Sequence, residues 1–229
     1  MQDNDDPSIE QVLPQFGLVD TTPSRWENLK RRIFELNGAG AESSTTYRVL
    51  FIGRHGEGYH NRALETYGRE AWTNRAIQTA LISFEGIALA SGNNAAVAPK
   101  AIIKEKLREA NFLQHTCNMR RTRSFIKETY PQFEIEEGFT EEDIFWGDSE
   151  TDDLLRTRVR EGLDEIFEKD NSWYISITAH AVTNRAIREV LGAPAKRMPT
   201  GGAFAMVISV TPTSEQAEIG FSGTTSEVC

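Results

Sequence analysis

Residues 47–57 read YRVLFIGRHGE, and this stretch decides the fold that the sequence predicts. The first seven residues form a largely apolar run with β-branched side chains, which is typical of a buried strand. Arg54 and His55 follow at the point where the strand gives way to a loop. Ligands of open α/β sheets bind at the carboxyl ends of strands, so the pair indicates a site for an anionic, phosphorylated substrate. The alternative, for this pair alone, is a salt-bridging arginine beside a surface histidine.

A second apolar run, residues 173–178, ends in the same way, with His180 following it before a predicted helix. In a parallel sheet His180 would emerge at the same edge as His55. A helix N-terminus carries partial positive charge and free N–H groups, so an imidazole there suits a phosphate. The alternative for His180 is a plain neighbour of a helix N-cap. Two histidines at two strand ends favour the functional interpretation.

Helices and strands alternate along the chain, which predicts an α/β fold, a three-layer sandwich with a mostly parallel central sheet. Residues 1–20 are expected to form an extended N-terminal arm, and residues 21–229 a single domain. The expected helices are 22–37, 76–90, 118–130, 149–169 and 182–191. The expected strands are 47–52, 97–103, 173–178 and 203–210.

Composition narrows the classes of function. A net charge of −9 argues against general nucleic-acid binding. The apolar stretches are too short for a membrane span, and the acidic N-terminus lacks the features of a signal peptide. Cys117 and Cys229 make neither a disulfide framework nor a metal cluster. We therefore expect a cytoplasmic protein with no metal or cofactor and no nucleic-acid or membrane partner.

Further motifs follow the first one in a fixed order. They are RHGEGYHN at 54–61, RAIQTA at 75–80, LRE at 107–109, EEGFTEED at 136–143, TAH at 178–180 and PTGG at 199–202. With this series the chain resembles the histidine phosphatase superfamily, which has the phosphoglycerate mutase-like fold, and in particular its fungal members. The resemblance extends from about residue 47 to residue 210. Each motif is weak or moderate alone, and the ordered set is specific.

The resemblance implies a role for each matching residue. His55 would be the nucleophile that becomes phosphohistidine, and Glu109 would donate the proton. The rest of the site would be His180 together with the phosphate-binding residues Arg54, Asn61 and Arg75. Phosphoryl transfer needs positive charge around the equatorial oxygens, which two arginines and a second imidazole supply without a metal. Glu109 also lies in a charged run, residues 104–109, and such a run is usually a solvated face.

The sequence thus predicts a phosphoric monoester hydrolase, a metal-independent phosphatase acting on a small phosphorylated metabolite. A mutase is less expected, because no lid that would hold and turn the substrate can be identified. The alternative is a catalytically impaired or dead relative that binds a phosphorylated ligand or partner.

The chain departs from the resembled family in two places. Only 20 positions separate His55 from Arg75, where the family has many tens, so an internal segment is expected to be missing. Arg75 would then be tethered by a loop instead of a strand. Val182 stands where relatives have small residues, and it is expected to crowd a phosphate.

Three arginines, at positions 120, 121 and 123, fall in the helix expected at 118–130. They could contact distal parts of an anionic substrate. The alternative is that they pair with carboxylates elsewhere in this acidic chain.

Overall fold

The structure, a computed structural model, describes residues 14–38, 44–56, 74–84, 101–111, 118–147 and 149–212. Its helices are α1 (Arg25–Gly38), α3 (Arg75–Phe84), α4 (Arg123–Thr129), α5 (Asp152–Lys169) and α6 (Ala181–Val190), with 3₁₀ turns η1 (Pro14–Gly17) and η3 (Glu105–Leu107). Its strands are β1 (Thr46–Arg54), β2 (Ile102–Ile103), β3 (Glu134–Ile135), β4 (Tyr174–Ala179) and β5 (Ala203–Val210). Helices and strands alternate, as an α/β fold requires.

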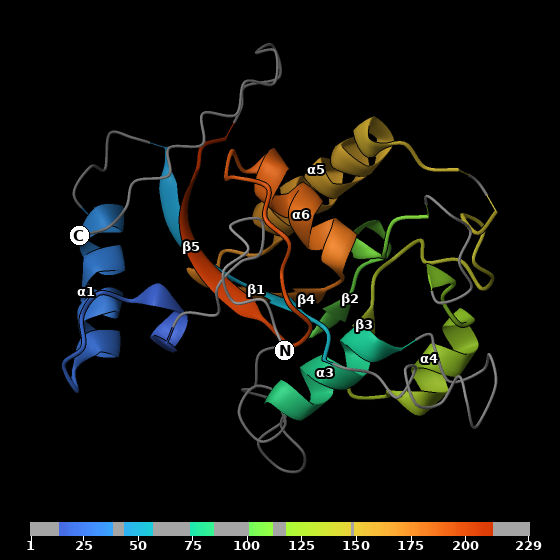
Figure 1. Cartoon of the computed structure of the whole chain (residues 1–229), viewed down its shortest axis with the longest axis horizontal. Helices are drawn as coiled ribbons and strands as arrows, with labels where there is room; N and C mark the ends of the chain where they lie inside the picture. The colour runs from blue at the N-terminus through green and yellow to red at the C-terminus, as the bar shows by residue number, and fades with distance from the viewer. Residues whose placement is uncertain are drawn as a thin grey trace, which may run out of the picture.

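The central sheet has the strand order β4-β1-β5 (Figure 1). β1 pairs with β4 in parallel and with β5 antiparallel, so the described sheet is mixed and its predicted, mostly parallel character is not confirmed. The connection after α6 determines the direction of β5. It returns to the end of β1, where the Arg54 N–H donates to the Gly202 carbonyl at 2.8 Å, and β5 must then run back along β1. β2 and β3 form a separate parallel pair.

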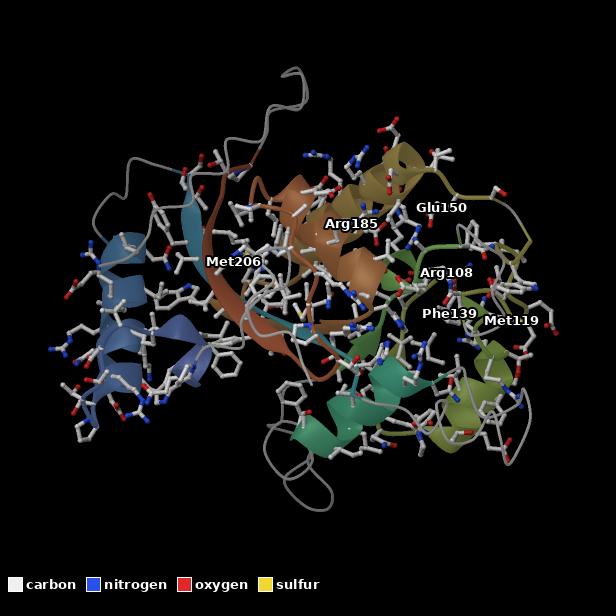
Figure 2. The ribbon with its side chains drawn as sticks, viewed as in Figure 1. Arg108, Met119, Phe139, Glu150, Arg185 and Met206 are labelled. Carbon is white, nitrogen blue, oxygen red and sulfur yellow. The ribbon has the colours of Figure 1, made fainter. Side chains whose placement is uncertain are left out.

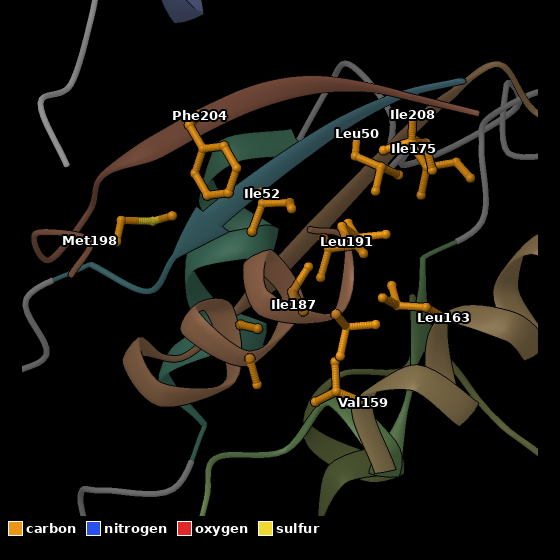
Figure 3. Close-up of a cluster of buried hydrophobic side chains, with 14 of the residues drawn as sticks. Leu50, Ile52, Val159, Leu163, Ile175, Ile187, Leu191, Met198, Phe204 and Ile208 are labelled. Atoms are coloured by element: carbon orange, nitrogen blue, oxygen red, sulfur yellow. The ribbon is translucent and has the colours of Figure 1, made fainter. Parts of the chain in front are cut away.

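The main core lies between the sheet and the helices α5 and α6 (Figure 3). Leu50 and Ile52 point from β1 to this side, and Val159, Leu163 and Ile187 meet them from the two helices. All five side chains are almost completely buried. Burial of one such side chain contributes roughly 1.5–3 kcal/mol, so this cluster fixes the sheet against α6, the helix that begins beside the site.

Helix α1 covers the opposite side of β1, which gives the described residues three layers (Figure 1). Ile33 of α1 is fully buried. Part of the predicted N-terminal arm also packs on this side of β1. Residues 14–17 form the turn η1, so this part of the arm is not extended as predicted. The Phe16 ring lies 5.2 Å from the Phe51 ring of β1, centre to centre, and this contact covers apolar surface that an extended arm would leave exposed.

A second, smaller cluster lies away from the sheet and joins α3 and α4 to β2 and β3. Its buried members are Ile126, Tyr130, Phe133 and Phe139. In Figure 2 Phe139 lies well to the right of Met206 of β5. Helix α4 is shorter than predicted, because the Thr122 side chain caps it by accepting a hydrogen bond from the Phe125 N–H at 3.2 Å. None of the described helices is long and apolar enough to cross a membrane.

Candidate active site

The two predicted histidines lie side by side at one edge of the sheet. β1 and β4 run in parallel with Arg54 opposite Ala179, so the residue that follows each strand emerges at the same end. The His55 N–H extends the pairing by donating to the Ala179 carbonyl at 3.0 Å. The rings of His55 and His180 are 5.2 Å apart, centre to centre, and meet edge to face.

His55 is held in one tautomer. Its side chain is 2% exposed, and its Nδ1 lies 2.9 Å from the Gly56 carbonyl oxygen. A carbonyl oxygen only accepts, so Nδ1 carries the proton and Nε2 keeps its lone pair. Burial lowers the pKa of His55 to about 4; the hydrogen bond with the Gly56 carbonyl opposes this shift, and the nearby charges of Arg75 and Arg54 add to it. The imidazole is therefore uncharged at neutral pH and available as a nucleophile.

His180 is the N-cap residue of α6, although its side chain makes no capping hydrogen bond. Its Nδ1 is buried and has no hydrogen-bond partner within the described part of the chain. Burial lowers the pKa of His180 to about 3, and the nearby charges of Arg75 and Arg54 contribute to this shift. An unpaired ring nitrogen beside the helix N-terminus is suited to contact an anion.

Arg54 and Arg75 reach this edge from two different elements. Nη1 of Arg54 donates to the Met198 carbonyl at 2.7 Å. Arg75 begins α3, and Thr79 of that helix accepts a hydrogen bond from the Gly56 N–H at 2.9 Å. A helix that is tied to the Gly56 N–H therefore carries Arg75. The chain that leads to it, residues 57–73, lies outside the described residues, so the expected loop tether stays a prediction.

Glu109 lies at the N-terminus of α6. Its Oε1 accepts from the backbone N–H of Ala110 at 3.0 Å and of Thr183 at 3.2 Å. It is near enough to Arg54 to raise the pKa of that guanidinium, although burial, the larger effect, lowers it. The structure thus brings together His55, Glu109, His180, Arg54 and Arg75, while Asn61 lies outside the described residues. Their catalytic and binding roles stay predictions.

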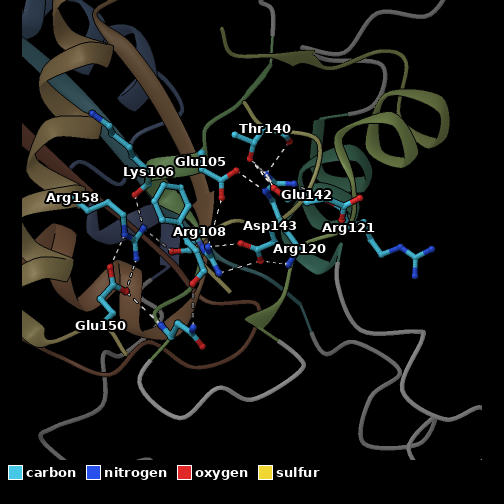
Figure 4. Close-up of polar contacts among 12 residues, drawn as sticks. Glu105, Lys106, Arg108, Arg120, Arg121, Thr140, Glu142, Asp143, Glu150 and Arg158 are labelled. Atoms are coloured by element: carbon cyan, nitrogen blue, oxygen red, sulfur yellow. Dashed lines mark hydrogen bonds and ion pairs between the residues drawn. The ribbon is translucent and has the colours of Figure 1, made fainter. Parts of the chain in front are cut away.

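Buried ion pairs position the segment that carries Glu109 (Figure 4). Arg108 donates to both carboxylate oxygens of Asp143, at 2.7 and 3.2 Å. Arg158 of α5 donates to the carbonyls of Lys106 and Arg108, at 2.7 and 3.2 Å. The run 104–109 is therefore not simply a solvated face, since Arg108 within it is buried.

Arg120 pairs with a carboxylate and with backbone carbonyls, as the alternative to substrate contact predicted for the three arginines. Its Nε donates to Glu105 at 2.6 Å, and its guanidinium lies 4.2 Å from the centre of the Phe139 ring. Arg120 and Arg121 precede α4 instead of lying within it. Arg120 thus joins the segments around residues 105 and 140, which is a structural role.

The turn at 198–202 explains why its sequence is rich in glycine. The Gly201 N–H donates to the His55 carbonyl at 3.0 Å, with φ of +72° at Gly201. A Cβ on Gly202 would lie 2.9 Å from the Pro199 carbonyl oxygen. Only glycine fits this close approach. The same turn positions the Met198 carbonyl, which accepts the hydrogen bond from Arg54.

Three supporting residues near the site had no predicted role, namely Thr79, Thr183 and Asn184. Asn184 is fully buried and donates to the Gly53 carbonyl at 3.0 Å, which fixes the end of β1. Thr183 and Asn184 are polar residues on the side of a helix that faces the protein core, and this placement was the signal in the sequence that could have indicated their roles. Val182 packs against the main core cluster, and the expectation that it crowds a phosphate stays a prediction.

Among the described residues no group of three or more His, Cys, Asp or Glu side chains could hold a metal ion.

Stability should fall as the pH drops from 7 to 5, because His55 resists protonation in the folded chain. An unfolded imidazole titrates near pH 6.5, whereas the pKa of folded His55 is about 4. The unfolded state therefore binds more protons in this window, and the free energy of unfolding decreases as the pH falls through it. Urea unfolding at pH 7 and pH 5 should show a loss that His55→Asn reduces by about 1–2 kcal/mol. Equal losses in the two proteins would contradict the lowered pKa.

Comparison with known proteins supports the resemblance. No family model matches the chain. The chain is 28% identical over 282 residues to the "Probable phosphoglycerate mutase" of Arthroderma benhamiae, an alignment that covers 93% of this chain and 84% of that protein. It is 33% identical over 112 residues to "Phosphomutase-like protein 3" of Candida albicans, covering 48% of this chain and 35% of that protein. The resemblance to the phosphoglycerate mutase-like proteins of the histidine phosphatase superfamily is confirmed over most of the chain.

The first of these alignments is longer than the chain itself. It runs over 282 residues and this chain has 229, so at least 53 residues of the relative have no counterpart here. This agrees with a missing internal segment. Its position between His55 and Arg75 stays a prediction.

Solved structures of phosphoglycerate mutase-like proteins are also similar in part. A phosphoglycerate mutase from Bacillus anthracis is 18% identical with a TM-score of 0.42, over 74% of this chain and 91% of that chain. A mycobacterial glucosyl-3-phosphoglycerate phosphatase is 17% identical with a TM-score of 0.38, over 71% and 92%. Both TM-scores are below 0.5.

Proposed function

We propose that this chain is a metal-independent phosphatase that hydrolyses a small phosphorylated metabolite through a phosphohistidine on His55. One observation carries the proposal. An uncharged His55 lies beside His180 and near two arginines at one sheet edge, with its Nδ1–H bound to the Gly56 carbonyl and its Nε2 without a hydrogen-bond partner among the described residues. Nucleophile and positive charge are what phosphoryl transfer requires of a protein.

In the first step Nε2 of His55 attacks phosphorus, and the bond from phosphorus to the leaving oxygen breaks. The carboxyl of Glu109 gives its proton to that oxygen, which departs as an alcohol. Arg54 and Arg75 neutralise the charge that spreads over the equatorial oxygens. In the second step water attacks the phosphohistidine, the N–P bond breaks, and Glu109 takes the water proton. Phosphate leaves, and His55 is neutral again.

We favour hydrolysis over mutase activity because hydrolysis needs only water to complete the second step. A mutase must instead retain its phosphorylated product and turn it before water reaches the phosphohistidine. Inorganic phosphate and an alcohol are then the products, and the substrate is any small monoester that reaches the sheet edge.

A second candidate is an impaired relative that binds a phosphorylated ligand without turnover. The residues of the Arthroderma benhamiae protein that have no counterpart here favour this candidate. They amount to at least 53, the difference between the 282 aligned positions and the 229 residues of this chain. A chain that lacks these residues can keep a phosphate-binding site and still lack an efficient catalytic site.

Turnover of p-nitrophenyl phosphate in the presence of EDTA tests the proposal. We expect release of p-nitrophenol that is proportional to the enzyme and insensitive to the chelator, because arginines supply the charge that a metal would. Loss of turnover on chelation, restored by Mg²⁺ or Zn²⁺, would contradict metal independence. Absence of turnover with retained binding of inorganic phosphate would support the binding candidate instead.

A further inference from the structure

Thr183 joins the candidate proton donor to the helix that follows His180. It lies in the first turn of α6, and its side chain is fully buried. The residues it contacts, Arg108 and Glu109, come 75 and 74 positions earlier in the chain. A buried hydroxyl needs hydrogen-bond partners, and here both partners belong to the segment that positions the carboxylate.

Two groups of Thr183 face Oε1 of Glu109. The backbone N–H donates to it at 3.2 Å, and the hydroxyl oxygen lies 3.3 Å from it. The same hydroxyl lies 2.6 Å from the carbonyl oxygen of Arg108. A threonine has a single hydroxyl proton, so only one of the two acceptors can receive it at a time.

The arrangement therefore accommodates both protonation states of the carboxyl. When Glu109 is charged, the hydroxyl can turn toward Oε1 and join the two backbone N–H donors there. When Glu109 carries its proton, the hydroxyl donates to the Arg108 carbonyl instead. All the hydrogen bonds that described residues make to this carboxyl fall on Oε1, so Oε2 is the oxygen left for the reaction.

We infer that Thr183 is a positioning residue, which holds Oε1 of Glu109 and leaves Oε2 to transfer the proton. The inference rests on the proposed phosphatase function and names the atom that carries its acid step. The proton on Oε2 passes to the leaving oxygen while the bond from that oxygen to phosphorus breaks and the N–P bond forms. In the second step Oε2 takes a proton from the attacking water as the N–P bond breaks.

Thr183→Val removes the hydroxyl while it keeps nearly the same shape. The Arg108 carbonyl retains a donor, because Nη1 of Arg158 also lies 3.2 Å from it. The variant should therefore fold. Thr183→Ser is the matched control, since it keeps the hydroxyl and loses only a methyl group.

The experiment compares two substrates by kcat/KM, which reports only the steps up to the phosphohistidine. The leaving group of p-nitrophenyl phosphate departs without a proton, whereas that of glycerol 2-phosphate needs one. We expect Thr183→Val to reduce kcat/KM for glycerol 2-phosphate at least tenfold more than for p-nitrophenyl phosphate. Thr183→Ser should stay within about threefold of the parent on both, and Glu109→Gln should show the same selectivity as Thr183→Val.

The outcomes separate this inference from the proposed function. A parent enzyme that hydrolyses both substrates and a Thr183→Val variant that slows both equally, with an unchanged melting temperature, would overturn the positioning role alone. If Thr183→Ser is as selective as Thr183→Val, the hydroxyl is not the cause and the inference also fails. A parent enzyme that turns over neither substrate would overturn the proposed function and the inference with it.

Discussion

His55→Ala is expected to lose essentially all phosphatase activity, with kcat at least about 1,000-fold below that of the parent. The imidazole supplies the atom that takes the phosphoryl group, and alanine offers no replacement. Among the described residues His180 is the other imidazole, at 5.2 Å between ring centres, and it occupies the N-cap position of α6. Initial rates with p-nitrophenyl phosphate measure the effect.

The control for this prediction is the state of the fold. His55 is buried, so its replacement leaves a small cavity that can lower the melting temperature by a few degrees. A folded variant, shown by circular dichroism, with activity within tenfold of the parent would contradict the nucleophile assignment.

Arg54→Ala should reduce kcat/KM by about 100- to 1,000-fold, because it removes charge from the developing transition state. The Met198 carbonyl orients this guanidinium, and Glu109 lies near enough to act on it electrostatically. Lysine cannot reproduce the planar fork, so Arg54→Lys should recover only part of the loss. Arg54→Ala should also bind inorganic phosphate more weakly than the parent, which titration calorimetry measures.

Arg156→Ala is the matched control for the arginine variant. Arg156 makes ion pairs with Asp153 and Glu189 on the outer surface of α5 and α6. Exposed pairs of this kind contribute little to stability, and none of the site residues is involved. Activity of Arg156→Ala should equal that of the parent, and an equal loss in both variants would mean that the Arg54 effect is a general loss of charge or stability.

The sequence predicted the elements that bury a regular apolar pattern. β5 occupies the expected residues 203–210, and α5 ends at the expected Lys169. The two strand ends with His55 and His180 follow from the same patterns, because a buried strand must stop where polar residues begin. The positions of both histidines at one sheet edge could therefore be predicted from the sequence alone.

The direction of β5 and the support of Glu109 could not be predicted in this way. Direction depends on the turn at 198–202, whose hydrogen bonds to β1 join residues that are far apart in sequence. Glu109 depends on Thr183, 74 positions later, and on the buried pair of Arg108 with Asp143. Local patterns carry no information about such pairings. The late start of α4 depends on Thr122, an N-cap residue that the charged helix pattern obscured.

Trapping the phosphoenzyme tests the central claim most directly. The parent protein is mixed with a phosphate monoester, quenched in alkaline denaturant within one turnover, digested, and analysed by mass spectrometry. We expect one acid-labile, alkali-stable phosphoryl group on the peptide that contains His55, and none in His55→Ala. A phosphoryl group on another residue, or hydrolysis that proceeds without any phosphoenzyme, would contradict the assignment of His55 as the nucleophile.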